Sequence, residues 1–158
     1  MVVEIRRATI EDAALIAELN RDVQLVHANA LPWLFKPPMD GGEVVDEMRE
    51  ALAREGHVVY LASVDSIAAG YVLVELFRKQ DSARHVAHEM IYVHHISVRP
   101  EFQRKGVGKA LLDAAKAHGK SNGVDLFALD VWSFNEDAKK FFANYGLTNF
   151  NEKMWMKV

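Results

Sequence analysis

The segment from Ile91 to His118 constrains the fold of this chain most, because it places a strand, a tight turn and a helix in direct succession. An apolar stretch ends at Pro100, and a basic turn with Gly106 and Gly108 follows at once. From Val107 onward, apolar side chains recur at helical spacing. Neither glycine carries a Cβ, so backbone N–H groups at the helix N-terminus can close around an anion. The segment therefore predicts a strand that leads into a phosphate-binding turn.

Two common phosphate-binding loops do not fit this spacing. A Walker loop ends in Gly-Lys followed by Ser or Thr, whereas Lys109 is followed by Ala110. The dinucleotide fingerprint needs a third glycine three residues after the second, where this chain has Leu111. The pattern that remains is Gln-x-x-Gly-x-Gly, from Gln103 to Gly108. A turn that only eases the chain from strand to helix, and binds nothing, is the alternative.

The composition is that of an ordinary globular chain. Its 158 residues, 50% apolar and 26% charged, are enough for one well-buried core. Cysteine is absent, which excludes disulfides, thiolate metal ligands and a cysteine nucleophile. A formal net charge of −3 argues against nucleic acid as a partner. Because no apolar run approaches about 18 residues and the first residues lack a signal-peptide pattern, we expect a cytoplasmic protein with no membrane partner.

Periodicity along the chain predicts an α/β fold with a mixed sheet and the order β-α-α-β-β-β-α-β-α-β-β. The expected strands are residues 3–5, 58–64, 67–77, 90–98 and 126–131, followed by a last hairpin that includes Phe150, Met154, Met156 and Val158. The expected helices are residues 9–26, 44–52, 107–118 and 135–145. Prolines in the segment 31–38 forbid a regular helix there. Since no repeat or linker interrupts the pattern, we expect one domain over residues 1–158.

The strand, Gln103-x-x-Gly106-x-Gly108 and the helix together resemble the acetyl-coenzyme A loop of the GNAT superfamily of N-acetyltransferases. A second signature of that family is Asn-x-x-Ala-x-x-aromatic-aromatic followed by a glycine. Its counterparts here are Asn135, Ala138, Phe141, Phe142 and Gly146. The resemblance runs from Glu4 to the C-terminus and implies the GNAT fold with acetyl-coenzyme A as cosubstrate.

The resemblance also implies where the cofactor lies. In the family, the strand before the glycine loop splays from its neighbour, and the pantetheine arm pairs with its exposed backbone. The pyrophosphate rests on the amides of the loop. The residues expected to bind the cofactor are Ile96, Ser97, Val98, Gln103, Arg104, Lys105, Gly106, Val107, Gly108, Lys109, Asn135, Ala138 and Phe142.

A candidate general base lies on the strand that precedes the loop. Regular alternation would place Tyr92, His94, Ile96 and Val98 on one face, and Val93, His95 and Ser97 on the other. An ammonium group must lose a proton before it attacks a thioester, and histidine titrates near neutrality. His94 is the expected base, Tyr92 holds the other position that family members use, and Glu89 or His88 could act through water. The alternative is that the strand histidines are only tolerated beside a wet gap.

The second aromatic position of the Asn-x-x-Ala signature departs from the family pattern. Many members carry there a tyrosine that protonates the leaving thiolate, whereas this chain has Phe142. Tyr145, one helical turn on, either replaces that acid or packs in the core. Two alternative functions are therefore considered. The first, and the expected one, is acetyl transfer to an amine by direct attack in a ternary complex. The second is a coenzyme A-binding sensor or assembly subunit with weak or no turnover.

The expected acceptor is a primary amine on a small molecule or a peptide. His27, Trp33 and Phe35 belong to a segment that overhangs the acceptor site in the GNAT fold. They form an aromatic lid that selects the amine, or else Trp33 and Phe35 cap the core. No metal site is expected, because the seven histidines show no helical His-x-x-x-His pair or other zinc spacing. A homodimer through a strand edge or the apolar 31–38 segment is the expected assembly.

Overall fold

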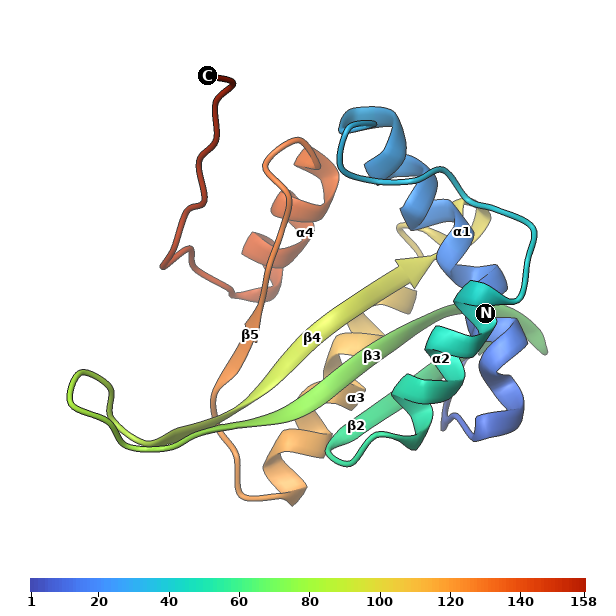
Figure 1. Ribbon diagram of the computed structural model, residues 1–158. Coiled ribbons are helices and arrows are strands. Elements are labelled where there is room, and N and C mark those ends of the chain that lie inside the picture. The colour runs from blue at the N-terminus through green and yellow to red at the C-terminus, as the bar shows by residue number, and fades with distance from the viewer.

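The computed structural model describes all 158 residues, and its centre is a five-stranded sheet with the order β1-β2-β3-β4-β5 (Figure 1). The strands are β1 (Val3–Arg7), β2 (His57–Val64), β3 (Ile67–Lys79), β4 (His88–Val98) and β5 (Phe127–Leu129). The helices are α1 (Ala13–Ala30), α2 (Glu43–Ala53), α3 (Val107–Ser121) and α4 (Glu136–Tyr145), with 3₁₀ turns at Ile10–Asp12 and Pro100–Phe102. The first four strands are antiparallel, and β5 is parallel to β4. The order expected from periodicity is confirmed as far as α4.

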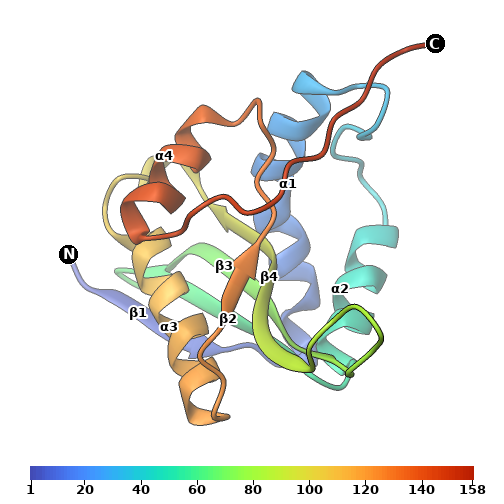
Figure 2. The same cartoon turned by 90° about the vertical axis from the view of Figure 1, so that its left-hand side faces the viewer.

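Different helices cover the two faces of the sheet (Figure 2). On one face, α1 and α2 pack over a core that includes Ile16, Leu19, Met48, Val59, Leu61, Tyr71 and Leu73. On the other, α3 and α4 pack over a core that includes Val72, Val74, Ile91, Val93, Leu111, Leu112 and Phe142. None of the helices combines the length and the hydropathy that crossing a bilayer requires.

The prediction of a hairpin at the C-terminus is wrong. Residues 147–158 form neither helix nor strand, and Phe150, Met154 and Met156 are 85%, 90% and 78% exposed. Figure 2 shows this segment passing in front of β5 and ending as an extended tail. A strand needs a hydrogen-bonded neighbour, and β5, at the edge of the sheet, spans only three residues. The alternating methionines therefore predicted a strand that has no partner.

A bulge in β4 changes which side chains share a face. Leu73 of β3 pairs with His95 and Val74 pairs with Val93, so His94 is an extra residue in the ladder. Ile96 and Val98 consequently pack on the α3/α4 side with Ile91 and Val93. The polar side chains Tyr92, His94, His95 and Ser97 lie on the α1/α2 side. The expectation that His94 shares a face with Ile96 and Val98 is wrong, because it assumed an unbroken pleat.

β4 loses its second neighbour halfway along its length. β5 pairs only with Ile91, Tyr92 and Val93, whereas β3 stays paired with β4 as far as Val98. Figure 1 shows β5 diverging from β4 beyond this point. Residues 94–98 therefore have no strand partner on the β5 side, which is the splayed arrangement that the family resemblance implies.

A close approach at Gly119 fixes α3 on β4. A Cβ at this position would lie 2.6 Å from Ile91 Cγ1 and 3.3 Å from the carbonyl oxygen of Val124. We expect Gly119→Ala to destabilise the protein, because overpacking of about 1–3 kcal/mol exceeds the roughly 1 kcal/mol that alanine gains inside a helix. Urea unfolding of Gly119→Ala in the parent and in an Ile91→Ala background measures this. An equal loss in both backgrounds would show that the contact is not the cause.

Candidate functional site

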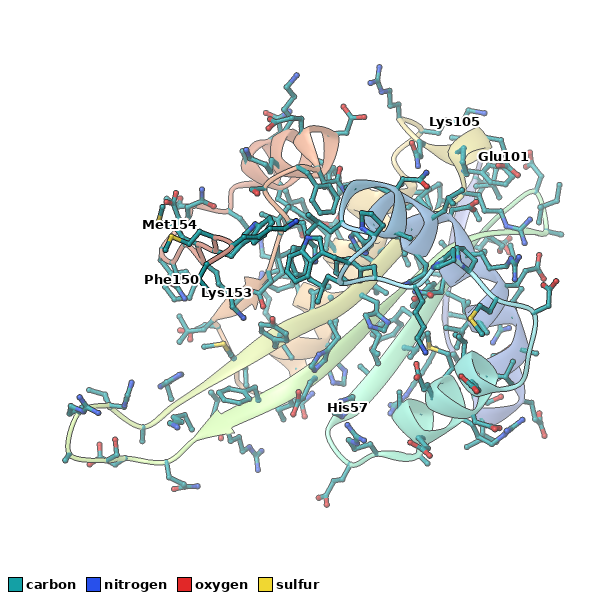
Figure 3. All side chains as sticks on the ribbon, turned by 45° about the horizontal axis from the view of Figure 1, so that its top comes forward. His57, Glu101, Lys105, Phe150, Lys153 and Met154 are labelled. Carbon is teal, nitrogen blue, oxygen red and sulfur yellow. The ribbon has the colours of Figure 1, made fainter.

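The glycine loop lies between the end of β4 and the N-terminus of α3. Gly106 is the N-cap of α3 with φ of +83°, and Arg104 is also left-handed with φ of +59°. No side chain caps the first turn of α3 and no acidic residue lies in it, so its N–H groups are open to an anion. Lys105 lies at this end of the molecule and adds a positive charge (Figure 3). The loop has the backbone geometry and the charge of an anion site.

The two glycines of the loop differ in what surrounds them. Nothing lies within 4 Å of a Cβ placed on Gly106, whereas a Cβ on Gly108 would lie 3.0 Å from Cζ of Phe141. Gly108 therefore allows α3 to pack closely on α4, and only Gly106 faces open space. Lys109 is paired with Asp113 at 2.7 Å, so its ammonium is less available to an anion than that of Lys105.

The remaining expected cofactor residues have structural partners. Gln103 Nε2 donates to the carbonyl oxygen of Val98 at 3.0 Å and ties the loop to β4. Ser97 is buried and its hydroxyl donates to the carbonyl oxygen of Leu19 at 2.7 Å, which leaves only its backbone for a ligand. Asn135 caps α4 by accepting from the N–H of Ala138 at 3.1 Å. Phe142 is 7% exposed and belongs to the α3/α4 core.

Three polar side chains from adjacent strands meet where β4 leaves β5. His94 Nε2 lies 2.6 Å from Oε2 of Glu75, and His57 Nε2 lies 3.9 Å from the same oxygen. The rings of His57 and His94 are stacked, with centroids 5.3 Å apart and planes 13° apart. The carboxylate orients the His94 imidazole and stabilises the imidazolium that forms when His94 accepts a proton. The sequence indicated His94 but not Glu75 or His57, because only the strand register brings them together.

Two other β4 side chains are less suited to accept a proton. His95 Nδ1 lies 3.4 Å from the Tyr71 hydroxyl, and desolvation by the surrounding protein lowers the pKa of His95 to about 4. The Tyr92 hydroxyl donates to Asp130, and burial together with that carboxylate raises the pKa of Tyr92 to about 12. His94, with its carboxylate partner, is the best-arranged proton acceptor on the strand.

Two further candidates lie away from His94. Glu89 pairs with Arg78 at 3.0 Å in the β3–β4 hairpin, which projects from the body of the molecule in Figure 1. Glu89 precedes His94 by five residues, which is about 16 Å along a strand. The Tyr145 hydroxyl donates to Asp113 of α3 at 2.8 Å, and desolvation, with that carboxylate, holds the pKa of Tyr145 far above its usual range. The structure brings neither side chain to His94.

An aromatic cluster joins the end of α1, the proline-rich segment and the residues after β5. It consists of His27, Phe35, Trp132 and Phe134, with ring centroids 4.9–6.2 Å apart. Burial lowers the pKa of His27, and the charge of His27 contributes to the lowered pKa of His95, so the cluster lies beside β4. Trp33 lies apart and contacts Trp155 of the tail at 4.7 Å. The structure thus brings His27 and Phe35 together without Trp33, and adds two rings that the sequence reasoning missed.

Comparison with known sequences gives one family. Residues 25–147 match the Acetyltransferase (GNAT) family. An uncharacterised N-acetyltransferase in the pepI 3′ region of Lactobacillus delbrueckii subsp. lactis is 32% identical over 111 residues. That match covers 70% of this chain and 63% of the relative, so the chain aligns with somewhat less than two thirds of the relative's length.

Solved structures share the fold at low sequence identity. A tetramutant of the BH1408 protein from Bacillus halodurans has a TM-score of 0.91 at 23% identity and covers both chains completely. AAC(6')-Iy, in complex with the bisubstrate analogue CoA-S-monomethyl-acetylneamine, has a TM-score of 0.77 at 18% identity over 100% of this chain and 99% of its own. A predicted acetyltransferase from Clostridium acetobutylicum with acetyl-CoA has a TM-score of 0.72 at 16% identity, covering 99% of this chain and 96% of its own.

Proposed function

Because the chain belongs to the GNAT family of acetyltransferases, we propose that it moves the acetyl group of acetyl-coenzyme A to a primary amine by direct attack in a ternary complex. The observation that carries this proposal is the 2.6 Å pair of His94 and Glu75, at the point where β4 loses β5. A histidine held by a carboxylate is a common arrangement for a general base.

The backbone of β4 provides a path for the cofactor from the loop to His94. In this proposal the pyrophosphate binds the amides of residues 104–109, and the pantetheine arm pairs with Ile96, Ser97 and Val98. Residues 94–98 span about 13 Å of strand. An arm that starts at the loop and follows this edge therefore brings the thioester to His94.

The chemistry then needs one proton acceptor and an attacking amine. His94 takes a proton from the acceptor ammonium, and the neutral amine attacks the thioester carbonyl carbon. The C–N bond forms, the C–S bond breaks and the coenzyme A thiolate leaves, while the new amide nitrogen gives up its second proton to water. Since Phe142 has no proton to give and Tyr145 is bonded to Asp113, the thiolate takes its proton from water.

The surroundings of the site favour an acceptor whose amine is attached to an apolar or aromatic group. The aromatic cluster defined above offers ring surface next to β4, and Trp132 is 38% exposed. The lowered pKa values of His27 and His95 keep both rings neutral at neutral pH, so neither repels an incoming ammonium. AAC(6')-Iy, which has the same fold, is by contrast an aminoglycoside N-acetyltransferase.

Thiol release from acetyl-coenzyme A with a panel of primary amines tests the proposal. We expect arylalkyl amines to give a higher kcat/KM than short diamines, aminoglycosides or peptide N-termini. Phe35→Ala should raise KM for such an amine about tenfold, since roughly 1–3 kcal/mol of ring contact is lost. Trp33→Ala, which removes an aromatic ring outside the cluster, should leave KM unchanged. Binding of acetyl-coenzyme A without thiol release from any amine would instead favour the coenzyme A-binding sensor.

A homodimer and a single-domain organisation stay predictions. Trp33, at 58% exposure, and the exposed apolar side chains of residues 150–158 provide surface that a second copy of the chain could cover.

A further inference from the structure

Three side chains with metal-binding atoms converge on the α1/α2 face of the sheet. One ring nitrogen of His57, one of His94 and a carboxylate oxygen of Glu75 all lie within 4.8 Å of one another. They come from β2, β3 and β4, three neighbouring strands, so the backbone holds them side by side. We propose that this His–Glu–His cluster binds a divalent transition metal such as Zn²⁺, and that the bound metal inhibits acetyl transfer.

His57 is arranged as a metal ligand. Its side chain is 6% exposed at the start of β2 (Figure 3), and its Nδ1 lies 3.4 Å from the carbonyl oxygen of Glu55. A carbonyl oxygen only accepts, so in the tautomer that makes this contact Nδ1 carries the hydrogen and Nε2 presents a lone pair toward Glu75. Metal-bound histidines commonly donate their other N–H to a backbone carbonyl in this way.

The electrostatics of the cluster favour a cation at its centre. In that tautomer the lone pair of His57 Nε2 faces a carboxylate oxygen at 3.9 Å, so two electron-rich atoms oppose each other beside the buried His57 side chain. His94 satisfies that carboxylate from one side only, at 2.6 Å. A cation between the three atoms would accept electron pairs from all of them.

The distances are close to those of a tetrahedral site. Zn²⁺ binds imidazole nitrogen and carboxylate oxygen at about 2.0–2.2 Å, which places neighbouring ligand atoms roughly 3.3 Å apart. The observed separations of 2.6 and 3.9 Å lie on either side of this value, so rotation of the Glu75 carboxylate toward His57 would equalise them. Two imidazoles and one carboxylate suit Zn²⁺, Co²⁺ or Ni²⁺ and leave an open position for water.

In the pair with Glu75, His94 Nε2 carries the hydrogen because a carboxylate oxygen only accepts, so Nδ1 holds the lone pair that takes the acceptor's proton. A metal bound at Nε2 would move the ring hydrogen to Nδ1 and so remove that lone pair. The metal and the base role therefore exclude each other, and the metal acts as an inhibitor. This consequence rests on the proposed function, whereas metal binding itself does not. The histidine spacing predicted no metal site, because the three ligands lie on separate strands rather than at helical spacing.

Metal binding is measured first, without reference to activity. Full-length protein is freed of metal with a chelator, the chelator is removed, and the protein is titrated with Zn²⁺ by calorimetry and with Co²⁺ by its visible absorption. We expect one equivalent per chain, with Co²⁺ showing the intense bands of a four-coordinate site. His57→Ala and Glu75→Gln should weaken binding at least tenfold, while His88→Ala, a matched β4 histidine outside the cluster, should not.

Inhibition is measured second, with the best amine from the acceptor panel. Zn²⁺ should inhibit the parent protein, and chelator should restore its rate. In His57→Ala, Zn²⁺ should remove a much smaller fraction of the rate that this variant itself shows in chelator. Failure of the parent to bind one equivalent, or unchanged binding by His57→Ala, overturns the site whether or not the protein is an acetyltransferase. Stoichiometric binding without inhibition overturns the inhibitory role and also argues against His94 as the base.

Discussion

Replacing His94 with alanine is expected to lower kcat/KM for acetyl transfer to an alkyl primary amine by about 10²–10⁴-fold, the usual contribution of a positioned general base. The alkyl ammonium ion is the dominant acceptor species at neutral pH, and no other β4 side chain is as well placed to take its proton. His95 holds a proton poorly because its pKa is lowered to about 4, and the Tyr92 hydroxyl is bonded to Asp130.

The identity of the acceptor provides the sharpest control. An aryl amine or a hydrazine is largely unprotonated at neutral pH, so it needs no base before it attacks. His94→Ala should therefore lose much less activity with such an acceptor than with an alkyl amine at the same pH. An equal loss with both acceptors would mean that His94 supports binding or folding rather than proton transfer.

Two further variants separate His94 from its neighbours. Glu75→Gln keeps the shape of the side chain but removes the charge that stabilises the His94 imidazolium, so its loss should be intermediate. Tyr145→Phe should leave kcat unchanged, because the hydroxyl that it removes is bonded to Asp113 on α3. Full activity in His94→Ala together with a large loss in Tyr145→Phe would reverse the assignment of base and acid.

The sequence predicted those conformations that depend on residues adjacent in the chain. Gly106 has the positive φ that its place before α3 requires, and Asn135 caps α4 ahead of two acidic residues. The strands expected at residues 58–64 and 67–77 leave only Asp65 and Ser66 for the turn between them, and both residues have positive φ there. In each case the conformation depends on a few residues that are adjacent in the chain, so a local pattern is sufficient.

What the sequence did not predict depends on partners far away in the chain. The bulge at His94 exists only in the register of β3 with β4, and it reverses the side-chain alternation beyond that residue. Glu75 and His57 meet His94 across two strand pairings, so no spacing in the sequence shows the cluster. The alternation of Met154 and Met156 is that of a strand, but the sheet provides no neighbour for it.

A substitution in the glycine loop is expected to have the second large effect, on the binding of acetyl-coenzyme A. Gly106→Val is expected to weaken acetyl-coenzyme A binding by about 10²-fold or more, because the new side chain would occupy the open space beside Gly106 at the N-terminus of α3, where the pyrophosphate is proposed to bind. Two amide–phosphate hydrogen bonds lost at about 1.5–3 kcal/mol each are sufficient for this. At a ligand concentration of a hundred times its dissociation constant, the parent should gain about 2.7 kcal/mol, or roughly 5–10 °C in Tm. Gly106→Val should show no such gain.

Gly123→Val is the matched control for the strain that the substitution introduces. Gly123 also has a left-handed φ, +73°, and nothing lies within 4 Å of a Cβ placed on it, as at Gly106. It lies just beyond the opposite end of α3, about 24 Å from Gly106 along the helix. Both variants should melt at lower temperature than the parent without ligand, since a β-branched residue in this region costs roughly 1–2 kcal/mol. Only Gly123→Val should keep the rise in Tm with acetyl-coenzyme A, and a rise that persists in Gly106→Val would place the pyrophosphate elsewhere.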